Sequence, residues 1–128
     1  MPISVTAKEE FRVGSKFVIE GPNDDEPNLC VFEDDGETAY LYAVDISGKE
    51  LAIIYNVKDV VDREQPSIAK IGWSMDGMKA VLLINDFPHA VVDFSARRGY
   101  CRTAFPPPDP TRGWSGHEWN DDALNLFA

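Results

Sequence analysis

The sequence lacks long apolar runs and has only two cysteines among its 128 residues. No stretch approaches the roughly 18 consecutive apolar residues of a membrane-spanning helix. Residues 1–14 lack the basic start and apolar stretch that characterise a secretory signal. Cys30 and Cys101 are too far apart in sequence to form a CxxC pair. These absences predict a cytoplasmic protein, not a membrane protein, with free thiols, and leave one long-range disulfide as the alternative.

Known catalytic motifs are also absent. The sequence contains no phosphate-binding loop, no dinucleotide fingerprint, no zinc-protease motif and no serine-hydrolase elbow. His89 and His117 are its only imidazole bases, so general acid–base catalysis has few candidate residues. Its histidines and cysteines do not form locally spaced chelating pairs. We therefore expect no metal and no cofactor, and these absences favour a non-enzymatic protein over an enzyme without deciding between them.

Positive charge is scarce in the first half of the chain. The formal net charge is −10, and residues 1–66 contain 15 acidic and 6 basic side chains. Such a chain binds nucleic acid poorly, because attraction to phosphates supplies much of that affinity. A basic partner protein would instead be steered toward it. Solubility alone also accounts for acidity, so the charge favours a basic protein partner without requiring one.

What the sequence does contain is a series of short extended segments. Its length is typical of one domain, so we expect residues 1–128 to fold as a single unit. Runs rich in β-branched and aromatic residues, separated by turn residues, predict strands. The predicted strands are 11–20, 29–33, 38–45, 50–57, 68–74, 79–86 and 89–96. A connector at 58–67, with room for one helical turn, divides them into two groups.

Two stretches resemble each other at an offset of 41 residues. FEDDGETAYLYAVD begins at Phe32, and WSMDGMKAVLLIND begins at Trp73. Each contains an Asp-Gly pair, which is a strong hairpin signal between extended runs. Two such units are too few for a propeller. We therefore predict a mostly β fold of the α+β class, in which two antiparallel three-stranded meanders pack as one domain.

The C-terminal residues predict a different element. In SGHEWNDDALNLF, Ser115 and Glu118 have the spacing of a helical capping box. Trp119, Ala123 and Phe127 recur at a helical period and would form one apolar face. The prolines at 106–110 favour an extended connector before this segment. The sequence therefore predicts a short amphipathic helix at about residues 117–127.

The richest candidate for a binding surface precedes this helix. On an extended chain, Arg98 and Arg102 share one face with Tyr100 between them, an arrangement suited to gripping a carboxylate or phosphate. These arginines could equally pair with the acidic first half of the chain. Stiffness from the prolines would reduce the entropy lost on binding. The predicted contact residues are Arg98, Tyr100, Arg102, Trp114 and His117.

Several of these stretches together resemble a known family. The segments VFEDDGETAYLYAVD, GWSMDGMKAVLLIN, PHAVVDF, RRGYCRTAFPPP and HEWN are similar to a small bacterial family catalogued as a domain of unknown function. The resemblance covers nearly the whole chain, and GYCRTAFPPP with HEWN is its most particular part. It implies a compact bacterial protein of the cytoplasm. It implies no activity and no catalytic residues.

Two functional hypotheses follow. The first is a non-enzymatic module that binds a partner protein, as an immunity or regulatory protein; small acidic bacterial proteins that block toxins are an analogy of size and charge. The alternative is a small-ligand-binding or enzyme domain with a pocket under residues 97–119. The lack of a nucleophile–base set favours the first hypothesis.

Overall fold

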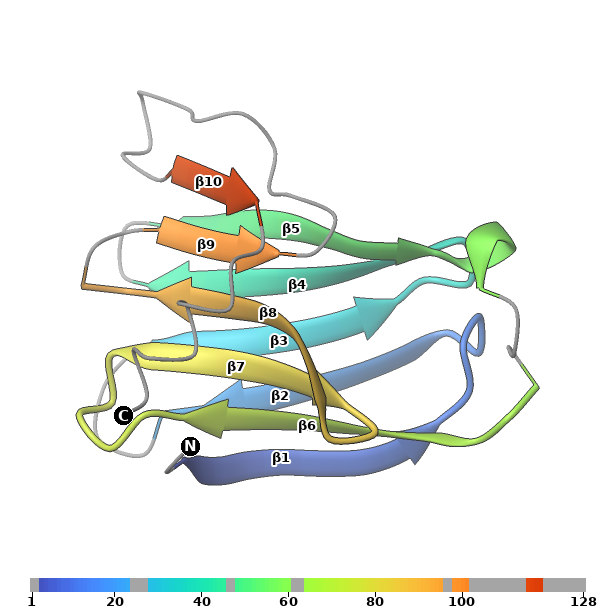
Figure 1. Ribbon diagram of the computed structural model, residues 1–128, viewed down its shortest axis with the longest axis horizontal. Helices are drawn as coiled ribbons and strands as arrows, with labels where there is room; N and C mark the ends of the chain where they lie inside the picture. Colours follow the sequence, from blue (N-terminus) through green and yellow to red (C-terminus); the bar gives the residue numbers. More distant parts are fainter. Residues whose placement is uncertain are drawn as a thin grey trace.

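The fold was obtained as a computed structural model, which describes residues 3–23, 28–45, 48–60, 64–95, 98–101 and 115–118. Within these residues ten strands form two sheets, one of six strands and one of four. Figure 1 shows the strands β6–β8 lying over the sheet formed by β2–β5. The prediction of a mostly β fold is confirmed.

The four-stranded sheet is a simple antiparallel meander in the order β2-β3-β4-β5. Its strands are β2 (Phe17–Pro22), β3 (Leu29–Asp34), β4 (Thr38–Asp45) and β5 (Gly48–Asn56). One turn of 3₁₀ helix, η1 (Val57–Asp59), follows β5 and begins the connector to the second sheet. The predicted helical turn in this connector is therefore confirmed.

The six-stranded sheet has the order β1-β6-β7-β8-β9-β10. Its strands are β1 (Ser4–Phe11), β6 (Ser67–Trp73), β7 (Lys79–Ile84), β8 (Phe87–Asp93), β9 (Arg98–Cys101) and β10 (Ser115–Glu118). Neighbouring strands are antiparallel except β9 and β10, which are parallel. Both predicted meanders are present, and each is longer than the three strands that the sequence predicts.

The core lies between the two sheets. Alternate side chains of β3, β4, β6 and β7 meet there, including Phe32, Leu41, Ile71, Trp73 and Leu82, all at most 2% exposed. The Trp73 ring stacks on Phe94 with centroids 5.4 Å apart, and its indole N–H donates to the Gly21 carbonyl at 3.1 Å. This hydrogen bond links β6 of one sheet to β2 of the other, and the packing of the ring adds a second contact between the sheets.

The two Asp-Gly hairpins form as predicted. Gly36 and Gly77 both have positive φ, 98° and 74°, a conformation that glycine adopts without steric penalty. The Asp35 carboxylate accepts hydrogen bonds from the amides of Glu37 and Thr38, both at 2.9 Å, and fixes the first turn. Local sequence therefore determines where each meander reverses.

The first predicted strand, 11–20, is wrong in its extent. The chain reverses between Phe11, which ends β1, and Phe17, which begins β2. Gly14 and Lys16 have φ values of 84° and 61°, which are incompatible with an extended strand. The alternating pattern of this segment therefore belongs to two strands in different sheets.

The start of the predicted C-terminal helix is also wrong. Ser115–Glu118 form β10, paired in parallel with β9, so the expected capping box does not exist. Strand pairing satisfies the backbone groups that a helix would have satisfied internally. Residues 119–127, which would have completed that helix, lie outside the described residues, as does the predicted proline connector. The alternative of a disulfide is wrong too, because Cys30 is a free thiol in the core.

Candidate interaction surface

The outer face of the four-stranded sheet combines aromatic, aliphatic and acidic side chains. Along β2, β3 and β4, side chains alternate between the core and this outer face, as the two-residue period of a strand requires. On β2, Val18 is 53% exposed and Glu20 and Pro22 are also exposed, and the described outer side chains of β3 and β4 are half-buried. We call the central six residues the tyrosine face: Val18, Glu20, Val31, Glu33, Tyr40 and Tyr42.

The strand register arranges these residues as a chequerboard. One row across the sheet is Val18, Glu33 and Tyr40. The neighbouring row is Glu20, Val31 and Tyr42. Each glutamate is therefore flanked by an aliphatic or aromatic residue on the adjacent strand. Such cross-strand neighbours are close enough for their side chains to interact.

The two tyrosines form a fixed pair. Their ring centroids are 6.1 Å apart, with 30° between the ring planes. The Tyr42 hydroxyl donates a hydrogen bond to Glu33 Oε1 at 3.0 Å. Partial burial, and then this hydrogen bond, raise the pKa of Tyr42, so it stays a neutral donor at physiological pH. Sequence analysis missed this face; the alternation Tyr40-Leu41-Tyr42 within a strand was the available signal.

Nearly all of the net charge belongs to this part of the chain. Residues 17–56, which form the four-stranded sheet and its loops, contain ten acidic side chains and one basic one, Lys49. By contrast, the ion pairs Lys70–Asp86 and Lys79–Asp76, at 2.6 and 2.7 Å, both lie in hairpins of the six-stranded sheet. The negative field of the protein is therefore concentrated on one sheet.

Asp34 belongs to the same acidic segment but has a structural role. Its side chain is 1% exposed, and its carboxylate accepts from the amides of Gly14 and Gly36 at 2.6 and 2.8 Å. The Tyr55 hydroxyl donates to the same carboxylate at 2.6 Å, and burial, followed by this hydrogen bond, raises the pKa of Tyr55 well above its usual range. Asp34 thus ties two turns to β5 and is not available to a partner.

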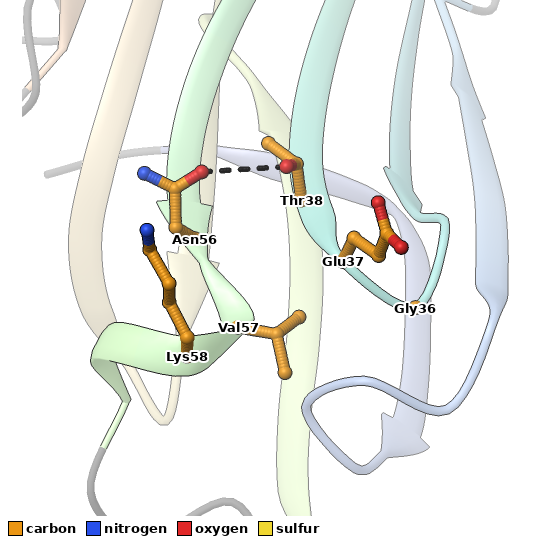
Figure 2. A pocket seen from close by; sticks show the side chains of 6 residues that line it. All are labelled: Gly36, Glu37, Thr38, Asn56, Val57 and Lys58. Carbon is orange, nitrogen blue, oxygen red and sulfur yellow. Dashed lines mark hydrogen bonds between the residues drawn. The ribbon is translucent and has the colours of Figure 1, made fainter.

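A hollow of about 400 Å³ opens where β4 and β5 meet η1. Figure 2 shows Thr38 facing Asn56 across the two strands, with Lys58 and Glu37 on either side. The Thr38 hydroxyl hydrogen-bonds to Asn56 Oδ1 at 3.3 Å. The polar lining of this hollow consists of Glu37, Thr38, Asn56 and Lys58. Its lining residues are different from residues 97–119, under which the sequence predicts a pocket.

The structure brings together part of the predicted contact set. In strand register, Arg98 lies opposite Asp93 on β8, and Tyr100 lies opposite Val91. Parallel pairing of β9 and β10 places His117 beside Tyr100. The Tyr100 ring is half-buried and packs against Val81, Leu83 and Val91. Arg102 and Trp114 lie outside the described residues.

Other candidate groups are dispersed. His89 is half-buried in β8, and its ring lies edge-on to that of Phe87 with the ring centroids 5.5 Å apart. Burial raises the pKa of the Cys30 thiol to about 12, so this cysteine is an inert core residue. Within the described ranges, no three histidine, cysteine or acidic side chains cluster as metal ligands. No helix in the same ranges is long and apolar enough to span a membrane.

The Asp76 turn predicts a pH dependence of stability. The Lys79 ammonium group, the Ser74 hydroxyl and the Met78 amide lower the pKa of Asp76 from 3.8 to about 2. Because the folded pKa is depressed, this stabilisation is present above pH 4 and is lost as the pH falls toward 2. Asp76 is exposed, so the effect is about 1 kcal/mol or less. Urea unfolding of Asp76→Asn across this window should show a flatter loss of stability than wild type, with Glu10→Gln as the charge-matched control.

Comparison with known proteins identifies a family. Residues 11–128 match the profile of a family described as an uncharacterized protein conserved in bacteria (DUF2251). An uncharacterized protein of Haemophilus influenzae is 39% identical over 93 residues, covering 69% of this chain and 58% of that relative. The chain thus spans less than two thirds of that relative's length. No solved structure matches. The chain belongs to the DUF2251 family, and the family resemblance seen in its sequence is confirmed.

Proposed function

We propose that this member of the DUF2251 family is a non-enzymatic protein-binding module of the bacterial cytoplasm, acting as an immunity or regulatory protein toward a basic partner. One observation carries the proposal: ten of its acidic side chains and a single basic one lie in residues 17–56. This segment forms one sheet and its loops, so its acidic side chains, apart from the buried Asp34, give this part of the molecule a negative field. Complementary fields of this kind accelerate encounter and exclude partners of the wrong charge.

The tyrosine face supports the same proposal. Tyrosine is enriched among the residues that dominate binding energy at protein interfaces, where an apolar ring and a polar hydroxyl are both used. Tyr40 and Tyr42 present two such rings at the centre of the acidic sheet. Side chains that are held in place before binding lose less entropy in a complex, which suits a module that blocks a partner.

The segment around Arg98 is a second candidate contact surface, whose arginines have either an internal role in stability or an external role in binding. Arg98 lies opposite Asp93, whose side chain is 6% exposed. The Asp93 carboxylate accepts hydrogen bonds from the amide and the hydroxyl of Ser95 at 3.0 and 2.9 Å, and a cation opposite it in register would add to this compensation, which is the internal role for Arg98. The alternative, a small-ligand site under residues 97–119, would use Tyr100 and His117, which are neighbours in strand register. In the double variant Arg98→Ala and Arg102→Ala, easier unfolding would indicate the internal role, and weaker partner capture with unchanged stability the external one.

Affinity capture from the native bacterium tests the function. The immobilised protein should retain a basic protein at stoichiometric level at low ionic strength. Raising the salt should weaken capture strongly, because exposed charges are screened beyond about 8 Å at physiological ionic strength. Mass spectrometry would identify the retained protein and titration would measure its affinity. Retention of no protein, or of an acidic protein insensitive to salt, would contradict the proposal.

A further inference from the structure

We propose that the tyrosine face binds an arginine-bearing, positively charged segment of the partner protein. This inference rests on the function proposed above and adds the surface and the chemistry of the partner. It is carried by the alternation of rings and carboxylates on one sheet face, together with the charge of residues 17–56.

Arginine fits this alternation better than lysine. A guanidinium group can stack on an aromatic ring and donate hydrogen bonds to a carboxylate at the same time. Glu33 lies directly opposite Tyr40 in register and accepts a hydrogen bond from the Tyr42 hydroxyl. One arginine placed over the tyrosine pair would therefore meet both a ring and an acceptor. The compact ammonium group of lysine has no planar surface to stack.

Glu20 supplies the second acidic position. It is exposed on β2, and no ion pair within the described residues involves it. Val18, two residues earlier on the same face, is 53% exposed. The methylene groups of a long basic side chain can cover such an aliphatic surface while the charged end reaches a carboxylate. Val18 and Glu20 therefore offer an apolar and an acidic contact at the spacing of alternate residues in an extended segment.

The face is also prepared for binding. Its side chains stand on three hydrogen-bonded strands, and the Tyr42 hydroxyl is already held by Glu33. Side chains that are ordered before binding lose less conformational entropy in the complex. A second copy of this chain is a poor occupant, because like charges facing each other are repulsive and this sheet has one basic residue.

Peptide titration tests the chemistry directly. The probes are a short synthetic peptide that alternates arginine with threonine, and its lysine counterpart. At an ionic strength of about 0.15 M, where exposed charges are partly screened, calorimetry should detect tighter binding of the arginine peptide. The double variant Glu20→Gln and Tyr40→Thr should weaken that binding at least tenfold, equivalent to about 1.4 kcal/mol. Threonine is chosen because its β-branched side chain suits a strand.

A matched variant separates the face from the general field of the protein. Glu9→Gln with Phe87→Thr removes the same charge and an exposed aromatic ring from the six-stranded sheet. It should bind the arginine peptide within twofold of wild type. Equal weakening in both variants, or equal affinity for the lysine peptide, would overturn the proposal. Thermal unfolding of each variant confirms that the binding differences arise in folded protein.

Capture of the native partner shows whether only the proposed binding surface is wrong or the proposed function as well. If the Glu20→Gln and Tyr40→Thr variant retains the native partner normally, the module binds through another surface and this inference is wrong. If wild type retains no partner at all, the proposed function itself fails. If wild type sediments as a dimer that the variant dissociates, a second copy occupies the face, which also overturns the inference.

Discussion

Replacing Asp34 by alanine should lower the free energy of unfolding by about 3–5 kcal/mol, because three hydrogen-bond donors lose their acceptor at about 1–3 kcal/mol each. The substitution leaves the Gly14 and Gly36 amides and the Tyr55 hydroxyl without their acceptor. Each buried donor left without an acceptor lowers the free energy of unfolding by about 1–3 kcal/mol. Urea unfolding followed by circular dichroism measures the loss.

The neighbouring residue provides the control for this prediction. Asp35 is exposed and holds only its own turn, so Asp35→Asn, which retains the acceptor oxygen, should leave the stability nearly unchanged. Tyr55→Phe removes one of the three donors to Asp34 and should fall between the two, at about 1 kcal/mol. An Asp34→Ala variant as stable as Asp35→Asn would show that the buried carboxylate is not needed to join these elements.

Replacing Trp73 by alanine should destabilise the fold by about 3–5 kcal/mol, as for other large aromatic side chains in a core. Trp73 is 2% exposed, stacks on Phe94 and donates a hydrogen bond to Gly21. Alanine would leave a cavity between the sheets and would also remove the donor to the Gly21 carbonyl. The variant's urea midpoint, measured by circular dichroism, reports this loss.

Two further variants separate the contributions of packing and hydrogen bonding. Trp73→Phe keeps an aromatic ring and loses the hydrogen bond, so it should lose clearly less stability than Trp73→Ala. Met75→Ala, two residues later and 76% exposed, should be nearly neutral. A Trp73→Ala variant within about 1 kcal/mol of Met75→Ala would mean that the sheets do not depend on this contact.

The sequence by itself determined the local features of the fold. Alternating apolar residues placed most strands, since one face of each must be buried. The Asp-Gly pairs placed two hairpins, because a tight reversal needs positive φ where glycine has no steric penalty. The family resemblance was also visible in the sequence and is confirmed. Each of these features depends on residues close together in the chain, so single-sequence patterns contain the information.

Only the tertiary structure decided how those segments combine. Residues 11–20 fit one strand by pattern, yet they belong to two sheets because the chain reverses around Gly14 and Lys16. Ser115–Glu118 fit a helix start, yet they pair with β9, which residues distant in sequence provide. The tyrosine face arises in the same way. Tyr42 meets Glu33 only across the β3–β4 pair, so their contact depends on the register of that pair and not on the alternation within either strand.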